Sequence, residues 1–450
     1  GLFYLNGVGA AMAMFVVFAQ SMILYIVLRR VWVAGKLYNL NSQADFFADR
    51  YESPKVLRLL VGILGLLAIV AAHFSVQLTA MGVIMQTISG GAISHIDGML
   101  FMTIGMLIIT LIGGMRGLSF TDFVLGLIMM FSLIFIVVSV FTGADISFAG
   151  IYRKLAEEFP AHLSTPGPIN YFTPQMLISF FFTYTFGAMM LPHMFVKSYV
   201  SKSIRSYKTL PFLYMGMTFP MMIVIFMLLG PVGRALLNVQ VPDSVVPTLI
   251  NTYVGSPFFQ GLLLVAVLAA IVSTASSALL ALSQIITVDI YKVFVKDKSE
   301  RHYYWIGQAG VVLMTLFGIW VSINSPAAIG YVVTSSLGIS AMMFLPVFFG
   351  LYWRRMNKYG VIAGMLSGIA VYAYITFGLG MTQASWLGFN ATFWGLLTEL
   401  AVMTVVAYYT PAASPDVQHR YFNRINYALY GREDLAPKAP AAAANIPQTN

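Results

Sequence analysis

Long apolar segments separated by short polar ones run from the first residues of the chain to about residue 410. Each segment is close to the ~20 residues that a helix needs to cross a hydrocarbon core of ~30 Å. The pattern predicts eleven membrane-spanning helices, at residues 2–28, 56–84, 98–114, 119–142, 174–198, 210–234, 258–290, 303–323, 327–351, 359–380 and 388–410.

The seventh span carries an unusual group of small hydroxyl residues, Ser273, Thr274, Ser276 and Ser277. On a helix that turns about 100° per residue, Ala270 joins three of these hydroxyls on one face, while Ser276 points nearly the opposite way. Neutral oxygens of this kind suit a hard monovalent cation such as sodium. A stripe of small residues also lets two membrane helices pack closely, so the pattern alone leaves an ion site and a packing face both open.

The fifth span contains Gly187 and Pro192, five positions apart in an apolar stretch. This spacing favours a broken helix whose freed backbone groups lie near the middle of the membrane. Phe181 and Tyr184 precede the break by about one turn, and we expect them to line a solute pocket with Gly187. His193 follows Pro192 and is expected near the cytoplasmic end of the span, where water can solvate it.

Three acidic residues lie in or at the ends of predicted spans, namely Asp122, Asp289 and Glu399. Acids within a membrane are usually functional or paired, because an unpaired charge in hydrocarbon is costly. Asp122 begins the fourth span and Asp289 ends the seventh, so both can reach water at the cytoplasmic side. Asp122 is the first candidate for a role in the passage of an ion, and Glu399 is the second.

The composition agrees with a membrane protein rather than a soluble one. Only 9% of the 450 residues are charged, 59% are hydrophobic and the mean hydropathy is +0.82. A soluble domain carries ~25% charged residues and needs them to cover its surface. The sequence contains no cysteine, which excludes disulfides, thiolate metal sites and a cysteine nucleophile within it.

The basic residues lie almost entirely on one side of the predicted topology. With residues 29–58 in the cytoplasm and the spans alternating from there, 22 of the 25 Lys and Arg face the cytoplasm. This bias is typical of cytoplasmic loops, and it explains the +9 net charge without a nucleic-acid partner. It predicts a multi-pass protein of the plasma membrane, whose residues 411–450 form a disordered cytoplasmic tail.

Four short motifs, in order along the chain, resemble those of the sodium:solute symporter family. They are 44–51 in the first loop, 113–122 from Gly-Gly to Thr-Asp, 269–277 continuing to Asp289-Ile-Tyr291, and 350–355 followed by Gly360 and Gly364. The Leu-Pro-His end of the fifth span is similar to the branch of the family that includes carboxylate permeases such as acetate carriers.

The resemblance implies an all-α polytopic membrane protein with an inverted-repeat core of five plus five helices, of the leucine-transporter type. We expect the chain to begin just after the first helix of this core. Residues 1–142 then hold the other four helices of the first repeat, and 143–173 form an extracellular or periplasmic loop. Residues 174–351 form the second repeat, 352–410 add two extra transmembrane helices, and 411–450 are the tail.

The resemblance also implies a function, which is sodium-coupled symport of a small organic solute by alternating access. The matching sodium ligands are the carbonyl of Ala270 and the hydroxyls of Ser273 and Thr274. Asp122 matches an acid of the family that helps sodium to enter or leave on the cytoplasmic side. Sodium is then the coupling ion, with no organic cofactor.

The second span adds two candidates for the solute pocket, His73 and Gln77, which lie one turn apart on a helix that faces the core in this family. The alternative for His73 is a hydrogen-bonded packing residue. The resemblance is compatible with a monocarboxylate, an amino acid or a vitamin-like solute. The oligomeric state stays open.

Three other functions are alternatives to symport. A symporter-like sensor would precede a signalling domain, but a tail of about 40 residues is shorter than typical domains. A proton-coupled carrier of the same fold stays open, because Asp122 or Glu399 can carry a proton. A membrane enzyme is disfavoured, since the six histidines are scattered and unpaired with acids, and no phosphate-binding Gly-rich motif occurs.

Overall fold

The computed structural model describes residues 1–324, 329–379 and 385–431; within these ranges, the side chains of 10–13, 70–72, 109, 112–119, 121, 226–227, 329–332 and 335 are outside the description. The part of the chain up to residue 163 forms the elements α1 (Leu2–Asn6), η1 (Gly7–Met14), α2 (Phe15–Ile23), η2 (Leu24–Leu28), α3 (Arg29–Tyr38), α4 (Gln43–Arg50), α5 (Val56–Leu67), η3 (Ala68–Phe74), α6 (Ser75–Ile88), α7 (His95–Gly143), α8 (Phe148–Glu158) and η4 (Pro160–Leu163).

The next part, which ends just after the seventh predicted span, forms α9 (Pro174–Met190), α10 (Pro192–Val200), α11 (Ser206–Ile223), η5 (Val224–Leu229), α12 (Gly230–Leu236), η6 (Pro242–Ser244), α13 (Val245–Tyr253), α14 (Pro257–Gln284), η7 (Ile285–Tyr291) and α15 (Lys292–Phe294). The last part forms α16 (Glu300–Asn324), α17 (Ile329–Ala341), α18 (Phe344–Tyr352), α19 (Lys358–Ala373), η8 (Tyr374–Gly378), the short hairpin β1 (Ser385–Trp386) and β2 (Phe389–Asn390), α20 (Ala391–Tyr409), α21 (Pro415–Gln418), η9 (His419–Arg424) and α22 (Ile425–Tyr430).

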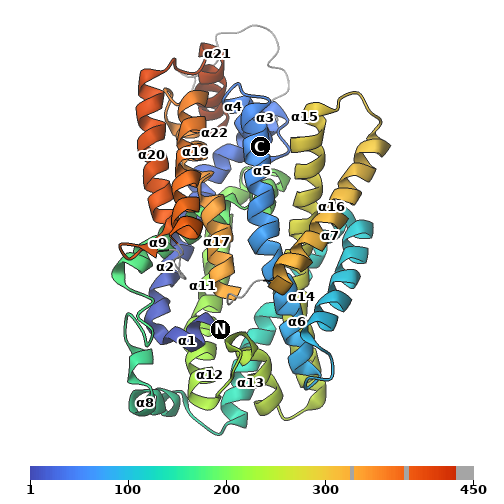
Figure 1. Ribbon diagram of the computed structural model, residues 1–450, viewed down its shortest axis with the longest axis vertical. Helices are drawn as coiled ribbons and strands as arrows, with labels where there is room; N and C mark the ends of the chain where they lie inside the picture. Colours follow the sequence, from blue (N-terminus) through green and yellow to red (C-terminus); the bar gives the residue numbers. More distant parts are fainter. Residues whose placement is uncertain (325–328, 380–384, 432–450) are drawn as a thin grey trace.

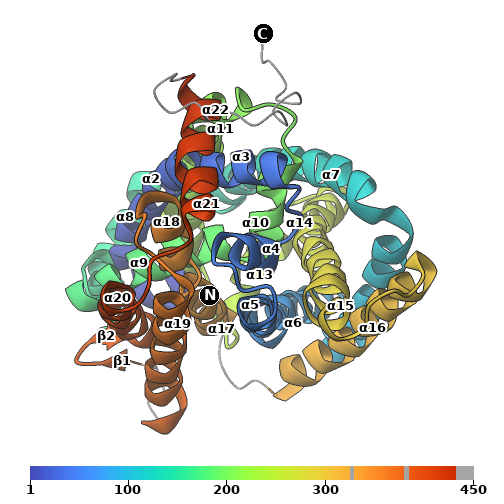
Figure 2. The ribbon, with the colours of Figure 1, turned by 90° about the horizontal axis from the view of Figure 1, so that it is seen from above.

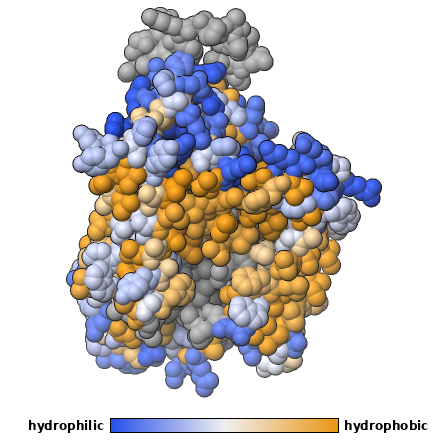
Figure 3. Space-filling model, turned by 45° about the horizontal axis from the view of Figure 1, so that its top comes forward, coloured by the Kyte–Doolittle hydropathy of each residue, from blue (hydrophilic) through white to orange (hydrophobic). Residues whose placement is uncertain are grey.

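The helices stand side by side in a bundle that is suited to a membrane. Six helical stretches of the described residues are long and apolar enough to cross it, and the bent pair α9 and α10 brings the number to seven. Four shorter apolar helices accompany them. A broad hydrophobic band separates two hydrophilic ends of the surface (Figure 3), and large side chains such as Phe101 and Phe131 are about 70% exposed within the spans. These side chains face lipid.

The predicted break in the fifth span is confirmed. Helix α9 ends at Met190, α10 begins at Pro192, and the two axes are bent by 53°. Leu191 between them has φ −55° and ψ 129°, which is not helical. Proline suits the first position of α10, because its missing N–H is one that a helix start leaves unpaired in any case.

Helix α7 differs from the expectation of two spans with a break near residues 115–118. One helix of 49 residues runs from His95 to Gly143. At 1.5 Å per residue it is ~74 Å long, more than twice the hydrocarbon thickness. Figure 2 shows α7 curving round one side of the bundle. Its residues Asp122–Gly143 are long and apolar enough to cross a membrane, and His95–Ile108 form a shorter apolar stretch. The loop predicted at 143–173 likewise contains the helix α8.

The segment after the last span is folded, which corrects the prediction of a disordered tail for residues 415–430. Helices α21, η9 and α22 lie at the same end of the molecule as α4 (Figure 1). Arg420 donates to both oxygens of Asp49 at 2.8 Å, and the Tyr421 hydroxyl donates to the same carboxylate at 2.6 Å. Residues 432–450 of the predicted tail lie outside the described residues. The division into repeats at 1–142 and 174–351 stays a prediction.

Helix α4 is the centre of the largest buried core at this end of the molecule. Arg50 is fully buried and donates from Nε to the Gly350 carbonyl at 2.6 Å and from a terminal nitrogen to Met356 at 3.4 Å. The Tyr51 hydroxyl donates to the Pro346 carbonyl at 2.5 Å. Burial lowers the pKa of the Arg50 guanidinium and raises that of the Tyr51 hydroxyl. These bonds tie α4 to α18 and to the turn that follows it.

We predict that replacing Arg50 with Met destabilises the protein by ~3 kcal/mol, because carbonyls of the α18 region lose buried, charge-assisted partners. Thermal unfolding in detergent measures the effect as a lower melting temperature. The matched control is Arg205→Met, which removes an exposed arginine. An Arg50→Met melting temperature equal to that of the control contradicts the role given to α4.

Candidate functional site

Helix α14 presents the predicted ion ligands on one face. The Thr274 hydroxyl donates to the Ala270 carbonyl at 3.1 Å, one turn earlier on the same helix. Ala270, Ser273 and Thr274 are all half-buried rather than fully packed. This half-burial leaves their oxygens within reach of a ligand that comes from outside the helix.

Asp122 of α7 lies against the same face, so the structure brings this predicted ion-pathway residue to the predicted ion ligands. Ser273 donates from Oγ to Oδ1 of Asp122 at 2.5 Å, and Ser277 donates to Oδ2 at 3.3 Å. Lys197 of α10 donates from Nζ to Oδ2 at 2.9 Å. The carboxylate side chain is 19% exposed, so it links the hydroxyl face of α14 to water.

The two other serines of the group, Ser276 and Ser277, lie on different faces of α14. Ser276 is buried, and its hydroxyl has no hydrogen-bond partner within the described part of the chain. That placement agrees with a packing residue on the far face of α14. The helix pattern alone did not decide between an ion ligand and a packing residue for Ser277. Ser277 contacts Asp122 and so belongs with the polar face.

His73 and His193 meet face to face, which corrects the expectation of a solvated His193. Their ring centroids are 5.2 Å apart, with an angle of 28° between the ring planes. His193 is only 6% exposed. It is buried because the 53° bend after α9 turns the start of α10 back into the bundle, toward η3.

The remaining solute-pocket candidates have different surroundings. The Tyr184 hydroxyl lies 3.2 Å from that of Thr334, which joins α9 to α17. A Cβ on Gly187 would clash with the Leu337 carbonyl, so this glycine also permits the close contact of α9 with α17. Gln77 is half-buried on α6. Phe181 is 37% exposed and packs on a neighbouring ring of α9, so the structure does not bring it into the buried set.

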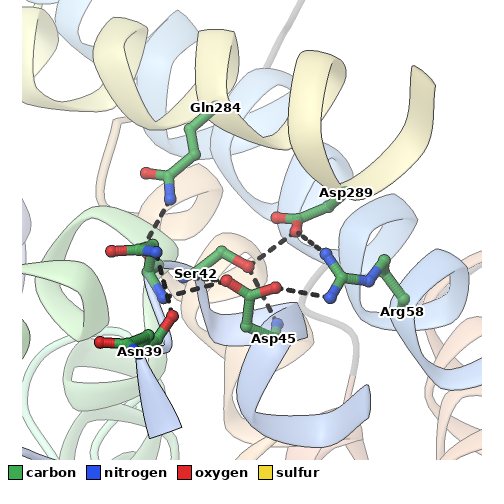
Figure 4. A network of polar contacts seen from close by, with 7 residues as sticks. Asn39, Ser42, Asp45, Arg58, Gln284 and Asp289 are labelled. Atoms are coloured by element: carbon green, nitrogen blue, oxygen red, sulfur yellow. Dashed lines mark hydrogen bonds and ion pairs between the residues drawn. The ribbon is translucent and has the colours of Figure 1, made fainter. Parts of the chain in front are cut away.

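A network at the end of the bundle that the basic residues predict to be cytoplasmic was not found from the sequence (Figure 4). Ser42 and Asp45 form a capping box at the start of α4. Ser42 also donates to Oδ1 of Asp289 at 2.7 Å, and Arg58 contacts Asp45 at 2.5 Å and Asp289 at 3.5 Å. Asp289, which was expected to reach water, is 1% exposed. The Ser-x-x-Asp pattern before α4 was the available signal, but it announces only a helix start.

This network closes the bundle at this end, because α4 bridges elements that are far apart in sequence. Gln43 donates to the Met190 carbonyl at 3.1 Å, next to the break between α9 and α10. Gln284 of α14 donates to the Asn41 carbonyl at 2.6 Å (Figure 4). An opening at this end must separate these contacts.

Glu399, the second acid proposed for ion passage, lies in a different place. It is fully buried on α20, and neither carboxylate oxygen has a hydrogen-bond partner among the described residues. A Cβ added to Gly368 of α19 would lie 2.9 Å from the Glu399 Cβ. Glu399 therefore belongs to the contact between α19 and α20, whereas Asp122 faces α14 and α10.

An apolar helical bundle with a broken span and a polar helix face beside it is typical of a secondary transporter. A family model described as the sodium:solute symporter family matches residues 1–368, and the chain belongs to this family. The protein is a sodium-coupled symporter and a multi-pass membrane protein.

Curated relatives agree with this assignment. The chain is 28% identical over 369 residues to the sodium/pantothenate symporter of Haemophilus influenzae, covering 77% of this chain and 73% of that protein. It is 27% identical to the sodium/pantothenate symporter of Escherichia coli, covering 90% and 83%. It is also 28% identical to the osmoregulated proline transporter OpuE of Bacillus subtilis, covering 74% and 68%.

Solved structures show the same fold. A sodium-coupled sialic acid symporter in a substrate-bound outward-open state superposes with a TM-score of 0.72 at 17% identity, covering 91% of this chain and 85% of that chain. A nucleobase-cation-symport-1 family transporter in a closed conformation superposes with a TM-score of 0.54 at 15% identity, covering 94% and 91%. At these identities the likeness is one of fold alone.

We predict that loosening the network around α4 exposes the cytoplasmic end. Ala281 lies under α4 beside Ser42 and Asp289 and is 6% exposed, so Ala281→Cys is a sheltered reporter in a sequence that has no cysteine. Adding Asp289→Asn removes a hydrogen bond to a charge, worth ~1.5–3 kcal/mol. Labelling by maleimide in inside-out vesicles should rise about tenfold or more.

The matched acid-to-amide control is Glu300→Gln, because Glu300 is 90% exposed and lies outside the network. It should leave the labelling of Ala281→Cys unchanged. Equal labelling with and without Asp289→Asn would show that these contacts do not hold the end closed.

Proposed function

We propose that this symporter imports a small organic solute and holds its coupling sodium on α14, at the Ala270 carbonyl and the Ser273 and Thr274 hydroxyls. The observation that carries the proposal is the meeting of this face with Asp122. Two predicted ligands, Ala270 and Thr274, already lie within hydrogen-bond distance of each other, and the third contacts a carboxylate at 2.5 Å. Hydroxyl and carbonyl oxygens suit a hard cation.

In this proposal, sodium passes by way of Asp122 between the ion site and cytoplasmic water. Its charge attracts a cation toward Ser273, and its partial exposure leaves a way out. Lys197 also donates from Nζ to this carboxylate, at 2.9 Å. An arriving sodium ion competes with this ammonium, so the pair prevents Asp122 from holding the ion too tightly.

The electrochemical gradient of sodium provides the driving force for import. One positive charge that crosses the membrane potential contributes about 2.3 kcal/mol per 100 mV, before the sodium gradient itself is counted. Sodium enters from outside and stabilises the state in which α4 closes the cytoplasmic end. The contacts of α4 with α9 and α14 then separate, and the ion and solute leave to the cytoplasm.

The solute is proposed to bind between η3 with α6 on one side and the break between α9 and α10 on the other. Helix breaks supply unpaired backbone groups near the middle of the membrane, where such solutes bind. His73, Gln77, Tyr184 and Gly187 remain the candidates, with Phe181 at the outer edge. The relatives are named for pantothenate and proline, so we place the solute of this protein among monocarboxylates, amino acids and vitamin-like molecules.

The protein is proposed to lie in the plasma membrane with its C-terminal end in the cytoplasm. The support is the 22 of 25 basic residues on that side of the topology, together with α21 and α22 beside α4 (Figure 1). The rival function, proton-coupled transport on the same fold, rests on Asp122 or Glu399 as the proton carrier, and Asp122 is the one of these two that contacts the hydroxyl face.

We predict that Ser273→Ala combined with Thr274→Ala raises the sodium concentration for half-maximal uptake by about tenfold or more, since two ligand oxygens are lost. Uptake by the intact transporter in proteoliposomes measures this. Ser276→Ala, on the opposite face of α14, is the control and should leave the sodium dependence unchanged. Sodium dependence that survives the double substitution would remove the ion site from this face.

We also predict that a pH gradient in sodium-free buffer does not drive uptake. Proteoliposomes with an imposed proton gradient and choline in place of sodium test this directly. Full uptake under these conditions identifies the proton as the coupling ion and makes the rival function the correct one.

A further inference from the structure

His73, a candidate for the solute site, and His193, which has no role in the steps above, form a polar pair with buried ring nitrogens. Their rings stack at 5.2 Å, one from η3 and one from the start of α10. Both nitrogens of His73 and Nδ1 of His193 are buried and have no hydrogen-bond partner within the residues that the structure describes. Buried polar atoms are nearly always paired, so three such nitrogens in contact call for a ligand.

Two distortions of the backbone meet at this pair. His73 lies in the π-helical turn η3, a rare form that occurs frequently at functional sites. His193 is the second residue of α10, directly after the break at Leu191. Each distortion sets the direction of one ring. As a result, the two rings meet between α5–α6 and α9–α10.

The geometry of the pair decides which atoms are free. A neutral imidazole has one N–H donor and one acceptor nitrogen, both in the ring plane. Rings inclined by only 28° and stacked face to face cannot bond to each other through these in-plane atoms. Each ring therefore keeps an N–H to donate to a third group.

The N–H donors of the pair suit an anion. Lys197 lies one turn after His193 on α10, and its positive charge acts on the His193 ring. The acid that faces Lys197, Asp122, is also bound by Ser273 and Ser277 on α14. A carboxylate has two acceptor oxygens and no donor, which matches two N–H groups that point away from one another's rings.

We propose that His73 and His193 bind the carboxylate group of the transported solute, each ring donating one N–H to it. The proposal rests on the proposed function, because it places the solute at the break between α9 and α10. Sodium on α14 offsets the negative charge of this group within the bundle, so the binding of the ion favours the binding of the solute. The pair of histidines selects acids over neutral molecules of the same shape.

The test uses the intact transporter, purified in detergent with sodium chloride. The probes are L-proline, D-pantothenate and the straight-chain monocarboxylates from acetate to hexanoate, each compared with its neutral amide or alcohol. Thermal shift titrations give an affinity for each. We expect at least one acid to bind at least ~10-fold more tightly than its neutral analogue, which is the discrimination that a lost charged hydrogen bond produces.

The variants His73→Phe and His193→Phe keep an aromatic ring and remove the donors. Each should weaken acid binding about tenfold or more and reduce the difference between acid and neutral analogue, while the stabilisation by sodium alone persists. His193→Asn, which restores one N–H donor, should recover part of the affinity. The control is His302→Phe, because His302 contacts Tyr291 and lies away from the pair.

The outcomes separate this proposal from the one on which it rests. If sodium stabilises every variant but no acid of the panel binds, or neutral analogues bind as well as acids, the histidine proposal is wrong and the symport function stands. The same holds if both Phe variants retain the wild-type affinity for acids. If sodium neither stabilises the protein nor drives uptake, the ion-coupling proposal itself has failed.

Discussion

The rest of the structure depends on one constraint, which is that polar groups within a hydrocarbon layer must find partners inside the protein. Most of the chain meets it by forming helices. The exceptions gather in a few places: the hydroxyl face of α14 with Asp122, the break between α9 and α10, and the stacked histidines. Each exception is costly, and we propose that these places bind the ion and the solute.

Helix α4 connects these places to the cytoplasmic end. One side of it contacts Asp289 and the end of α9, and the other side contacts α18 and the helices after the last span. A short amphipathic helix outside the membrane thus holds together elements that come from both halves of the chain. Movement of α9 and α10 against α14 cannot occur without a change at α4, which makes it the natural point of control for access from the cytoplasm.

Local patterns predicted the features that are themselves local. The apolar segments, the broken fifth span and the single face shared by Ala270, Ser273 and Thr274 follow from spacing along one helix, and the structure has the same helix and break. The continuity of α7 was not predicted, because Gly and Arg near residue 116 are typical of a loop, whereas the backbone is helical from His95 to Gly143.

The features that could not be predicted are contacts between residues far apart in sequence. Ser42 and Asp289 are separated by 247 positions, and Asp49 and Arg420 by 371. The sequence predicted a solvated His193, because residue spacing does not give the direction in which α10 leaves the bend at Leu191. The pattern of one helix does not predict which neighbouring element packs against a given face. These contact partners could therefore be identified only from the structure.

The central claim is that sodium binds to the hydroxyl face of α14, and the most direct measurement is equilibrium binding of radioactive sodium to the purified intact transporter. The account predicts saturable binding that Ser273→Ala with Thr274→Ala weakens about tenfold or more and that Ser276→Ala leaves intact. Binding of equal affinity in all three proteins would place the ion elsewhere and contradict the account.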